Sequence, residues 1–152
     1  MAIFKLRYAR RQIEKLMDID SIQAAIEEAE TQTSGEIRVS ISRFFWGSVR
    51  RAAERAFVRL DMMETRDRNG ILFLIVPSRK SFAVIGDAGI HAKVGQDFWD
   101  HLAVILGDKF RGKQFTEGLL EAIKAVGQKL SSHFPYDPGS DVNELPDSID
   151  LH

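Results

Sequence analysis

Apolar side chains recur along the chain with two different periods, one typical of helices and the other typical of strands. From residue 18 to residue 33 they return every three to four positions, which predicts an amphipathic helix that Asp18 can cap. Residues 36–42 then alternate between polar and apolar side chains, which predicts a half-buried strand. We therefore expect a helix followed by a strand at the start of the fold.

The middle of the chain predicts one more helix and two neighbouring strands. Helical spacing resumes over residues 49–60, and the continuous apolar run of residues 71–76 follows the turn dipeptide Asn69-Gly70. An uninterrupted apolar strand is typical of the centre of a sheet that is covered on both faces. Only four residues separate this run from the apolar segment 81–86, so we expect the two strands to form an antiparallel hairpin.

Two further amphipathic helices are expected in the second half of the chain. One begins near Asp97, and the other runs from about residue 119 to Phe134. Beyond Pro135 the chain contains proline and glycine and almost no apolar residues, which predicts a disordered tail.

Composition and charge narrow the class of protein. With 152 residues, 44% hydrophobic and 28% charged, the chain is typical of one soluble globular domain. The formal charge of −1 conceals a start rich in lysine and arginine and an end rich in carboxylates. We expect a basic segment over residues 1–15, an α/β domain over residues 16–135 and an acidic, disordered tail over residues 136–152.

Several classes of function are disfavoured by what the sequence lacks. It contains no cysteine, which excludes disulfides and thiol chemistry, and its four histidines do not have the spacing of zinc hydrolases. Neither a phosphate-binding glycine loop nor a nucleophile-elbow motif is present. We find no signal-peptide pattern and no apolar run long enough for a transmembrane segment, so a cytoplasmic location is expected. Phe4 and Tyr8 are the only aromatic residues of the basic start, and no nucleic-acid partner is expected.

The predicted topology gathers polar residues at one end of the sheet. If the first two strands are parallel and the third folds back, Glu36, Asn69 and Asp87 all lie at the amino end of the parallel strands. Asp97 can join them from the start of the following helix. Carboxylate and amide oxygens are hard ligands that suit Ca²⁺ or Mg²⁺. With Arg66 or Arg68 nearby, the same arrangement could hold a phosphate between a metal ion and a guanidinium group.

Each of these residues also has a purely structural interpretation. Asp87 can satisfy a turn or cap a helix, and Asp97 can cap the next helix. Asn69 can serve only the turn, and Glu36 can face solvent at a strand end. Their convergence at one end of the sheet is what favours a binding site.

Five separated blocks of the sequence resemble the TPM domain family in their order and spacing. They are Thr33 to Val39, Thr65 with Arg68 to Leu72, Phe82 to Ile90, Val94 to Asp100, and Phe115 with Glu117 to Leu119. The resemblance covers roughly residues 15–135. It implies a Rossmann-like three-layer α/β/α sandwich with a mixed, mainly parallel sheet.

The resemblance also implies a divalent-cation crevice formed by the loops that carry Glu36, Asn69, Asp87 and Asp97. One member of the family is described as an acid phosphatase of the thylakoid lumen. Other members are associated with Ca²⁺ or Mg²⁺ binding without clear phosphatase activity.

Two functions from different classes follow from these observations. The first is a binding or interaction module whose crevice holds Ca²⁺ or Mg²⁺. Its basic N-terminal segment or its acidic tail would contact a protein partner. The alternative is an acid phosphatase, a metal-assisted phosphomonoesterase acting on a phosphorylated substrate. In that enzyme the cation and Arg68 would neutralise phosphoryl oxygens while Asp87 or Asp97 activates a water molecule. Because the sequence offers no dedicated nucleophile, the binding module is the leading hypothesis.

Overall fold

A four-stranded mixed sheet lies between helices in the structure, a computed structural model that describes residues 10–43, 47–138 and 149–151. The strands are β1 (Glu36–Ile41), β2 (Gly70–Val76), β3 (Ser81–Gly86) and β4 (Asp150–Leu151). The helices are α2 (Ile19–Glu30), α3 (Val49–Arg59), α4 (Ala88–His91), α5 (Gln96–Arg111) and α6 (Phe115–His133), and the 3-10 turn η1 (Pro77–Arg79) joins β2 to β3.

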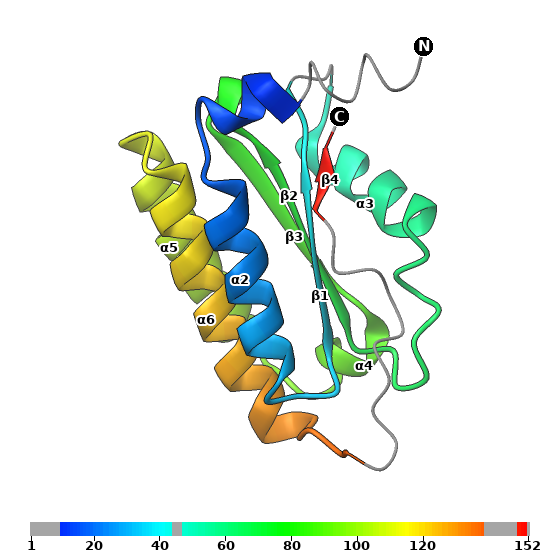
Figure 1. Cartoon of the computed structure of the whole chain (residues 1–152). Helices are drawn as coiled ribbons and strands as arrows, with labels where there is room; N and C mark the ends of the chain where they lie inside the picture. Colours follow the sequence, from blue (N-terminus) through cyan, green and yellow to red (C-terminus); the bar gives the residue numbers. More distant parts are fainter. Residues whose placement is uncertain (1–9, 44–46, 139–148, 152) are drawn as a thin grey trace.

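The helices form two layers, one on each face of the sheet. Figure 1 shows α2, α5 and α6 on one side of the strands and α3 on the other. The expected three-layer α/β sandwich is therefore confirmed. Among the described residues, no helix combines the length and the apolar character needed to cross a bilayer.

Strand pairing follows the predicted topology. The order across the sheet is β3-β2-β1-β4, in which β1 pairs in parallel with both β2 and β4, and β2 pairs antiparallel with β3. The register sets Glu36 opposite Gly70 and Ile71 opposite Gly86. The starts of β1 and β2 and the end of β3 consequently lie at one end of the sheet, as the sequence predicts.

The largest hydrophobic core lies between the sheet and the three-helix layer. Alternate residues of β1 and β2 point into it, because successive strand side chains face opposite sides of a sheet. The strand residues that contribute are Ile37, Val39, Ile41, Ile71, Phe73 and Ile75. On the other face, two smaller clusters join α3 to Leu72, Leu74 and Val76 of β2. The central strand β2 is therefore buried along its whole length, as expected.

The expectation that β1 is half-buried is wrong. All six of its residues are buried, including the polar side chains of Glu36, Arg38 and Ser40, which are 4%, 9% and 0% exposed. The alternation correctly identified a strand and its apolar face. It could not show that distant parts of the chain would cover the polar face as well.

The end of the chain supplies part of this cover. Residues 150 and 151 form β4 against β1, whereas the sequence predicted a disordered tail. Asp150 accepts a hydrogen bond from the buried Ser40 hydroxyl (2.8 Å) and pairs with Arg59 of α3 (2.8 Å). The hydrogen bond with Asp150 is also the main cause that raises the pKa of Arg59. The contacts of Asp150 thus join β1, β4 and α3.

Two short helical segments were not predicted, namely residues 10–14 and α4. Both are too short to show a hydrophobic period in the sequence. The predicted loop that includes residues 44–46 and the tail residues 139–148 lie outside the described residues.

Replacing Asp150 by alanine should lower the free energy of unfolding by about 1–3 kcal/mol, because the fully buried Ser40 hydroxyl loses its acceptor. The ion pair with Arg59, whose side chain is about half exposed, contributes little. Asp150→Asn is the matched control, since its amide oxygen can still accept from Ser40. Urea unfolding of the three proteins measures the effect. Equal midpoints for the wild type and Asp150→Ala would show that β4 adds nothing to stability.

Candidate functional site at the amino end of the sheet

Three of the predicted site residues lie in neighbouring positions where strands begin or end. Glu36 is the first residue of β1, Asn69 immediately precedes β2, and Asp87 follows β3. Main-chain hydrogen bonds connect them: the Glu36 N–H donates to the Asn69 carbonyl (3.3 Å), and the Asp87 N–H donates to the Gly70 carbonyl (2.9 Å). The backbone therefore holds all three at the amino end of the parallel strands.

Arg68 and Asp87 form a two-pronged ion pair. The Arg68 Nε lies 2.6 Å from Asp87 Oδ2, and its Nη2 lies 2.7 Å from Oδ1. The Asp87 side chain is 5% exposed and that of Arg68 is 47% exposed, so the carboxylate is buried beneath the guanidinium. The hydrogen bonds from Arg68 to Asp87, reinforced by the opposite charge, raise the pKa of Arg68 above its ordinary value.

Asp87 also caps helix α4. Its Oδ1 accepts a hydrogen bond from the Ala88 N–H at 2.7 Å. The cap interpretation of Asp87 is thus confirmed, and both carboxylate oxygens already accept hydrogen bonds. Two donors of Arg68 and the Ala88 N–H therefore share the Asp87 oxygens, and a metal ion that approaches Asp87 must compete with the positive charge of Arg68.

A close approach at Gly89 holds the Arg68 loop against α4. The Gly89 N–H donates to the Arg68 carbonyl at 2.9 Å. A Cβ at this position would lie 2.2 Å from the Asp67 carbonyl oxygen, which no side chain can tolerate without a shift of the main chain. Arg68 itself has a φ of 50°, an uncommon value for a residue with a side chain. The ion pair therefore depends on tight local backbone packing.

Asn69 carries the unsatisfied polar atom of the site. The residue is 1% exposed, its N–H donates to Thr65 Oγ1 (3.2 Å), and its Nδ2 donates to Ser34 Oγ (3.4 Å). Its side-chain oxygen Oδ1 is buried and has no hydrogen-bond partner. An acceptor buried in this way costs about 1–3 kcal/mol, so its presence favours a ligand at this position.

The space between Glu36 and Asp87 is partly filled by main chain. Gly70 lies between them across the sheet, and a Cβ on Gly70 would lie 3.0 Å from the carbonyl oxygen of Met62. Glycine therefore allows the segment before β2 to cross this end of the sheet. This close approach also places the Met62 carbonyl oxygen in the same region.

Asp97 does not join the other three residues in a ready cluster. It is exposed in the first turn of α5, and the residue that caps this helix is Gly95, not Asp97. In residues 10–43, 47–138 and 149–151, no group of three or more histidine, aspartate or glutamate side chains is placed to hold a metal ion. The structure thus brings Glu36, Asn69 and Asp87 to one end, pairs Asp87 with Arg68, and leaves Asp97 on the surface.

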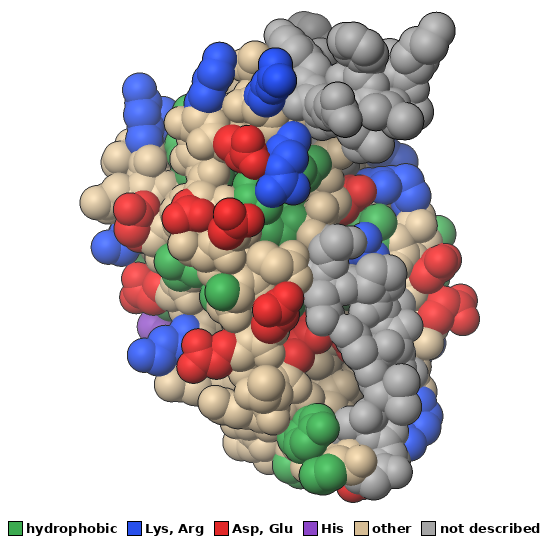
Figure 2. Space-filling model, in the orientation of Figure 1, with side chains coloured by type: hydrophobic (Ala, Val, Ile, Leu, Met, Phe, Trp, Pro, Cys, Tyr) green, Lys and Arg blue, Asp and Glu red, His purple; other side chains and the backbone are tan. Residues whose placement is uncertain are grey.

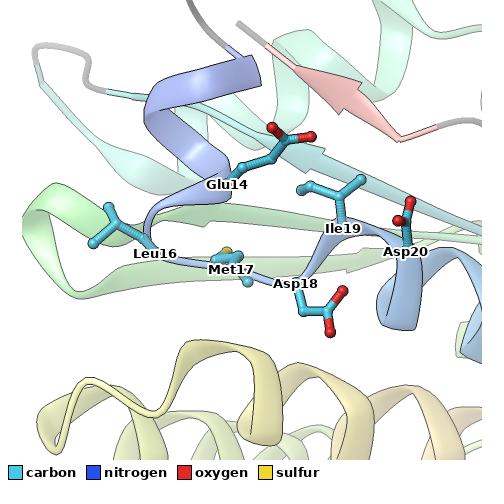
Figure 3. A pocket seen from close by; sticks show the side chains of 6 residues that line it. All are labelled: Glu14, Leu16, Met17, Asp18, Ile19 and Asp20. Carbon is cyan, nitrogen blue, oxygen red and sulfur yellow. The ribbon is translucent and has the colours of Figure 1, made fainter.

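Other acidic regions within the described part of the chain do not form a competing metal site. Figure 2 shows carboxylates spread over the face on which α2 lies. A hollow of about 430 Å³ lies beside the start of this helix, and Figure 3 shows the side chains that line it. In Figure 3, Asp18 points away from Glu14 and Asp20. Asp18 is also engaged as the cap of α2, with hydrogen bonds from the N–H and the hydroxyl of Ser21 that lower its pKa.

Comparison with known proteins assigns the family. The sequence profile of the TPM domain matches residues 15–129, so the chain belongs to the TPM domain family. The fold is similar to the NMR structure of the BA42 protein from the psychrophilic bacterium Bizionia argentinensis, with 34% sequence identity and a TM-score of 0.82. That match covers 91% of this chain and 97% of BA42.

Two more distant solution NMR structures share the fold. The N-terminal domain of the cg2496 protein from Corynebacterium glutamicum is 16% identical, with a TM-score of 0.59 over 78% of this chain and 74% of that one. The N-terminal domain of a P. gingivalis protein is 14% identical, with a TM-score of 0.65 over 80% and 82% of the two chains. A search of curated proteins gave no significant match.

Sequence reasoning missed the groups that support Asn69 and Asp87. Thr65 and Ser34 were noted only as parts of the family resemblance, yet they hold the Asn69 main chain and side chain. The two-pronged ion pair of Arg68 with Asp87 was not anticipated either. The adjacency of Arg68 and Asn69 at the turn, with Asp87 expected at the same end, was the available signal.

Substituting alanine for Gly89 should destabilise the protein by about 1–3 kcal/mol, because the new methyl group would overlap main chain at Asp67. Gly107→Ala is the control. Gly107 lies inside α5 with no atom closer than 3.5 Å to the new Cβ, so this change should stabilise by about 0.5–1 kcal/mol. Thermal unfolding measures both effects: Gly89→Ala should lower the melting temperature, and Gly107→Ala should raise it. A neutral Gly89→Ala would contradict the close packing of α4 on the Arg68 loop.

Proposed function

We propose that this TPM domain is a binding module that takes Ca²⁺ or Mg²⁺ at the amino end of its sheet. The observation that carries the proposal is the Asn69 side-chain oxygen, which is buried and has no partner. An amide oxygen is a hard ligand of the kind that both cations prefer. A bound cation would satisfy it where no described protein group does.

The other donors near Asn69 have the same chemistry. Glu36 and Asp87 are buried carboxylates at the same end of the sheet, on either side of Gly70, and are 4% and 6% exposed. Buried carboxylates favour a nearby positive charge. In the proposal Asn69 and Glu36 hold the cation, Asp87 can join them, and Asp97 contributes from the surface of α5. The cation would supply positive charge and fix the loops that carry these residues.

Arg68 acts as the internal counter-ion of Asp87 in this proposal. It already supplies the positive charge that a buried carboxylate requires. A divalent cation that recruits Asp87 must therefore compete with the guanidinium. Removing Arg68 leaves Asp87 without a counter-ion, and the affinity of the site for a cation should then increase.

Titration of the wild type with Ca²⁺ and with Mg²⁺, followed by amide NMR, should give saturable shifts centred on residues 36, 69 and 87. Asn69→Leu removes the side-chain oxygen at similar volume, and we expect it to weaken binding by about tenfold or more, since even an outer-shell change costs that much. Asn69→Asp, which keeps an oxygen and adds charge, should strengthen binding. An unchanged affinity in Asn69→Leu, or no saturable shift in the wild type, would contradict the proposal.

Two further variants test which carboxylates contribute to cation binding. Arg68→Gly should bind the cation more tightly than the wild type, and glycine is chosen because the residue has a φ of 50°. Asp97→Asn should weaken binding, whereas Asp100→Asn, an exposed carboxylate in the same helix that bonds to Gln96, should not. Equal effects of these two substitutions would remove Asp97 from the proposed ligand set.

Phosphomonoester hydrolysis is the second candidate, and one observation favours it. Arg68 is half-exposed and its ion pair uses two of the five N–H donors of a guanidinium group, which leaves others for a phosphate. Against this role, the Asp87 carboxylate already serves as the counter-ion of Arg68 and as the cap of α4.

With 4-nitrophenyl phosphate and Mg²⁺, we expect no hydrolysis above that of Arg68→Gly. Activity in the wild type that falls about a hundredfold or more in Arg68→Gly would instead establish the enzyme, because the loss of a positioned charge-stabilising group typically has an effect of this size. The two functions separate clearly in this variant: the binding module predicts tighter cation binding, and the phosphatase predicts loss of turnover.

A further inference from the structure

The open edge of β3 differs from the way proteins usually protect a sheet edge. Exposed edges are normally interrupted by charged residues, proline or a bulge, because unpaired strands recruit other strands. The six residues of β3 contain neither charge nor proline, and the pairing with β2 is continuous from Ser81 to Gly86. At the other side of the sheet, β4 pairs with part of the β1 edge.

Backbone groups on this edge have no partner in the described part of the chain. The Asp87 N–H bonds to Gly70, so with the alternation of antiparallel pairs Ile85 and Ala83 also point their N–H and C=O groups toward β2. Phe82, Val84 and Gly86 must then point theirs away from the sheet, and no hydrogen bond to these groups is found among the described residues.

A groove of about 220 Å³ follows this edge. Residues from both faces of β3 line it, together with Arg50 of α3 on one side and Trp99 and Ala103 of α5 on the other. An occupant therefore meets the edge itself and both helical layers. An extended chain suits such a groove, because its backbone can pair with the edge while alternate side chains turn to the two layers.

The charge of the residues that line the groove indicates which kind of partner fits it. Its described members include Arg50 and His91 and no carboxylate. The Arg50 side chain is 79% exposed, and its ion pair with Glu54, at 3.3 Å, is a weak surface contact. A second copy of this chain would bring its own Arg50 to the same groove, which places like charges together. An acidic peptide meets no such repulsion.

We propose that β3 is a docking edge for an extended acidic peptide of a partner protein, which adds to the sheet as a further strand. Its backbone pairs with Phe82, Val84 and Gly86, an apolar side chain lies against Trp99 and Ala103, and a carboxylate meets Arg50. This edge does not depend on the cation proposed at the amino end of the sheet.

The probe is a phage-displayed library of random peptides about eight residues long, which is within the usual length of a strand. Enriched peptides should be acidic with alternating apolar positions. When one is synthesised and added to the protein, hydrogen exchange should slow at the amides of Phe82, Val84 and Gly86. The amides of Ala83 and Ile85, already paired with β2, should change little.

Val84→Pro is the decisive variant. It removes an outward N–H that β2 does not use, so the fold should survive while peptide binding weakens by about tenfold or more. Val84→Thr, which keeps the N–H, is the matched control and should bind like the wild type. Ala103→Glu, an exposed substitution in α5, tests the groove without altering the strand and should also weaken binding. Arg50→Glu should change the preference of the library from acidic to basic peptides.

Three results would overturn the proposal. One is a library without enriched peptides. Another is enriched peptides that bind Val84→Pro, Ala103→Glu and the wild type equally. The third is a concentration-dependent dimer, measured by sedimentation, that Val84→Pro abolishes, since the occupant would then be a second copy of the chain.

Discussion

The complete burial of β2 is the constraint on which the rest of this structure depends. Its side chains enter a hydrophobic cluster on each face of the sheet, and its backbone pairs with β1 on one edge and β3 on the other. A shift of the register by one residue would exchange the two apolar faces, which differ in shape and partners. The burial of β2 therefore fixes its register with β1 and β3. That register decides which residues of these two strands lie at each end of the sheet.

That register has a direct consequence for the polar residues of the site. It places Glu36 and Asp87 on either side of Gly70, with Asn69 next to them, and it removes these side chains from bulk water. Buried polar groups require partners. Asp87 obtains them from Arg68 and Ala88, whereas the side-chain oxygen of Asn69 does not. This imbalance within one cluster makes the amino end of the sheet a binding site in our proposal, in which Asp87 serves first as the counter-ion of Arg68.

The two edges of the sheet differ in their strand pairing. A two-residue strand from the end of the chain pairs with β1 and is held by Ser40 and Arg59, whereas β3 keeps a regular, uncharged edge beside a groove. Gly86 ends this edge and Asp87 begins the cation site, so the two proposed sites adjoin. Such an arrangement allows one small domain to present a cation and a peptide-binding edge on neighbouring surfaces.

Much of the fold could be predicted because it depends on local periodicity. The apolar run of β2, the short connection to β3 and the helical spacing of α2, α3, α5 and α6 all identify their elements without knowledge of distant contacts. Since connections of this kind allow few topologies, the convergence of Glu36, Asn69 and Asp87 also followed from the sequence. The cap at Asp87 was one of two interpretations that its neighbours allowed.

Only the tertiary structure decided what depends on groups far apart in the chain. The burial of Ser40 and Arg38, the strand at residues 150–151 and the unsatisfied oxygen of Asn69 require knowledge of what covers each group and what it contacts. Periodicity reports the polarity of a position along its own element, but burial and hydrogen bonding depend on the arrangement of several elements. For this reason the sequence determined the end of the sheet at which polar residues meet. The tertiary structure decided that Asp87 is already paired, that the side-chain oxygen of Asn69 is not, and that Asp97 stays on the surface.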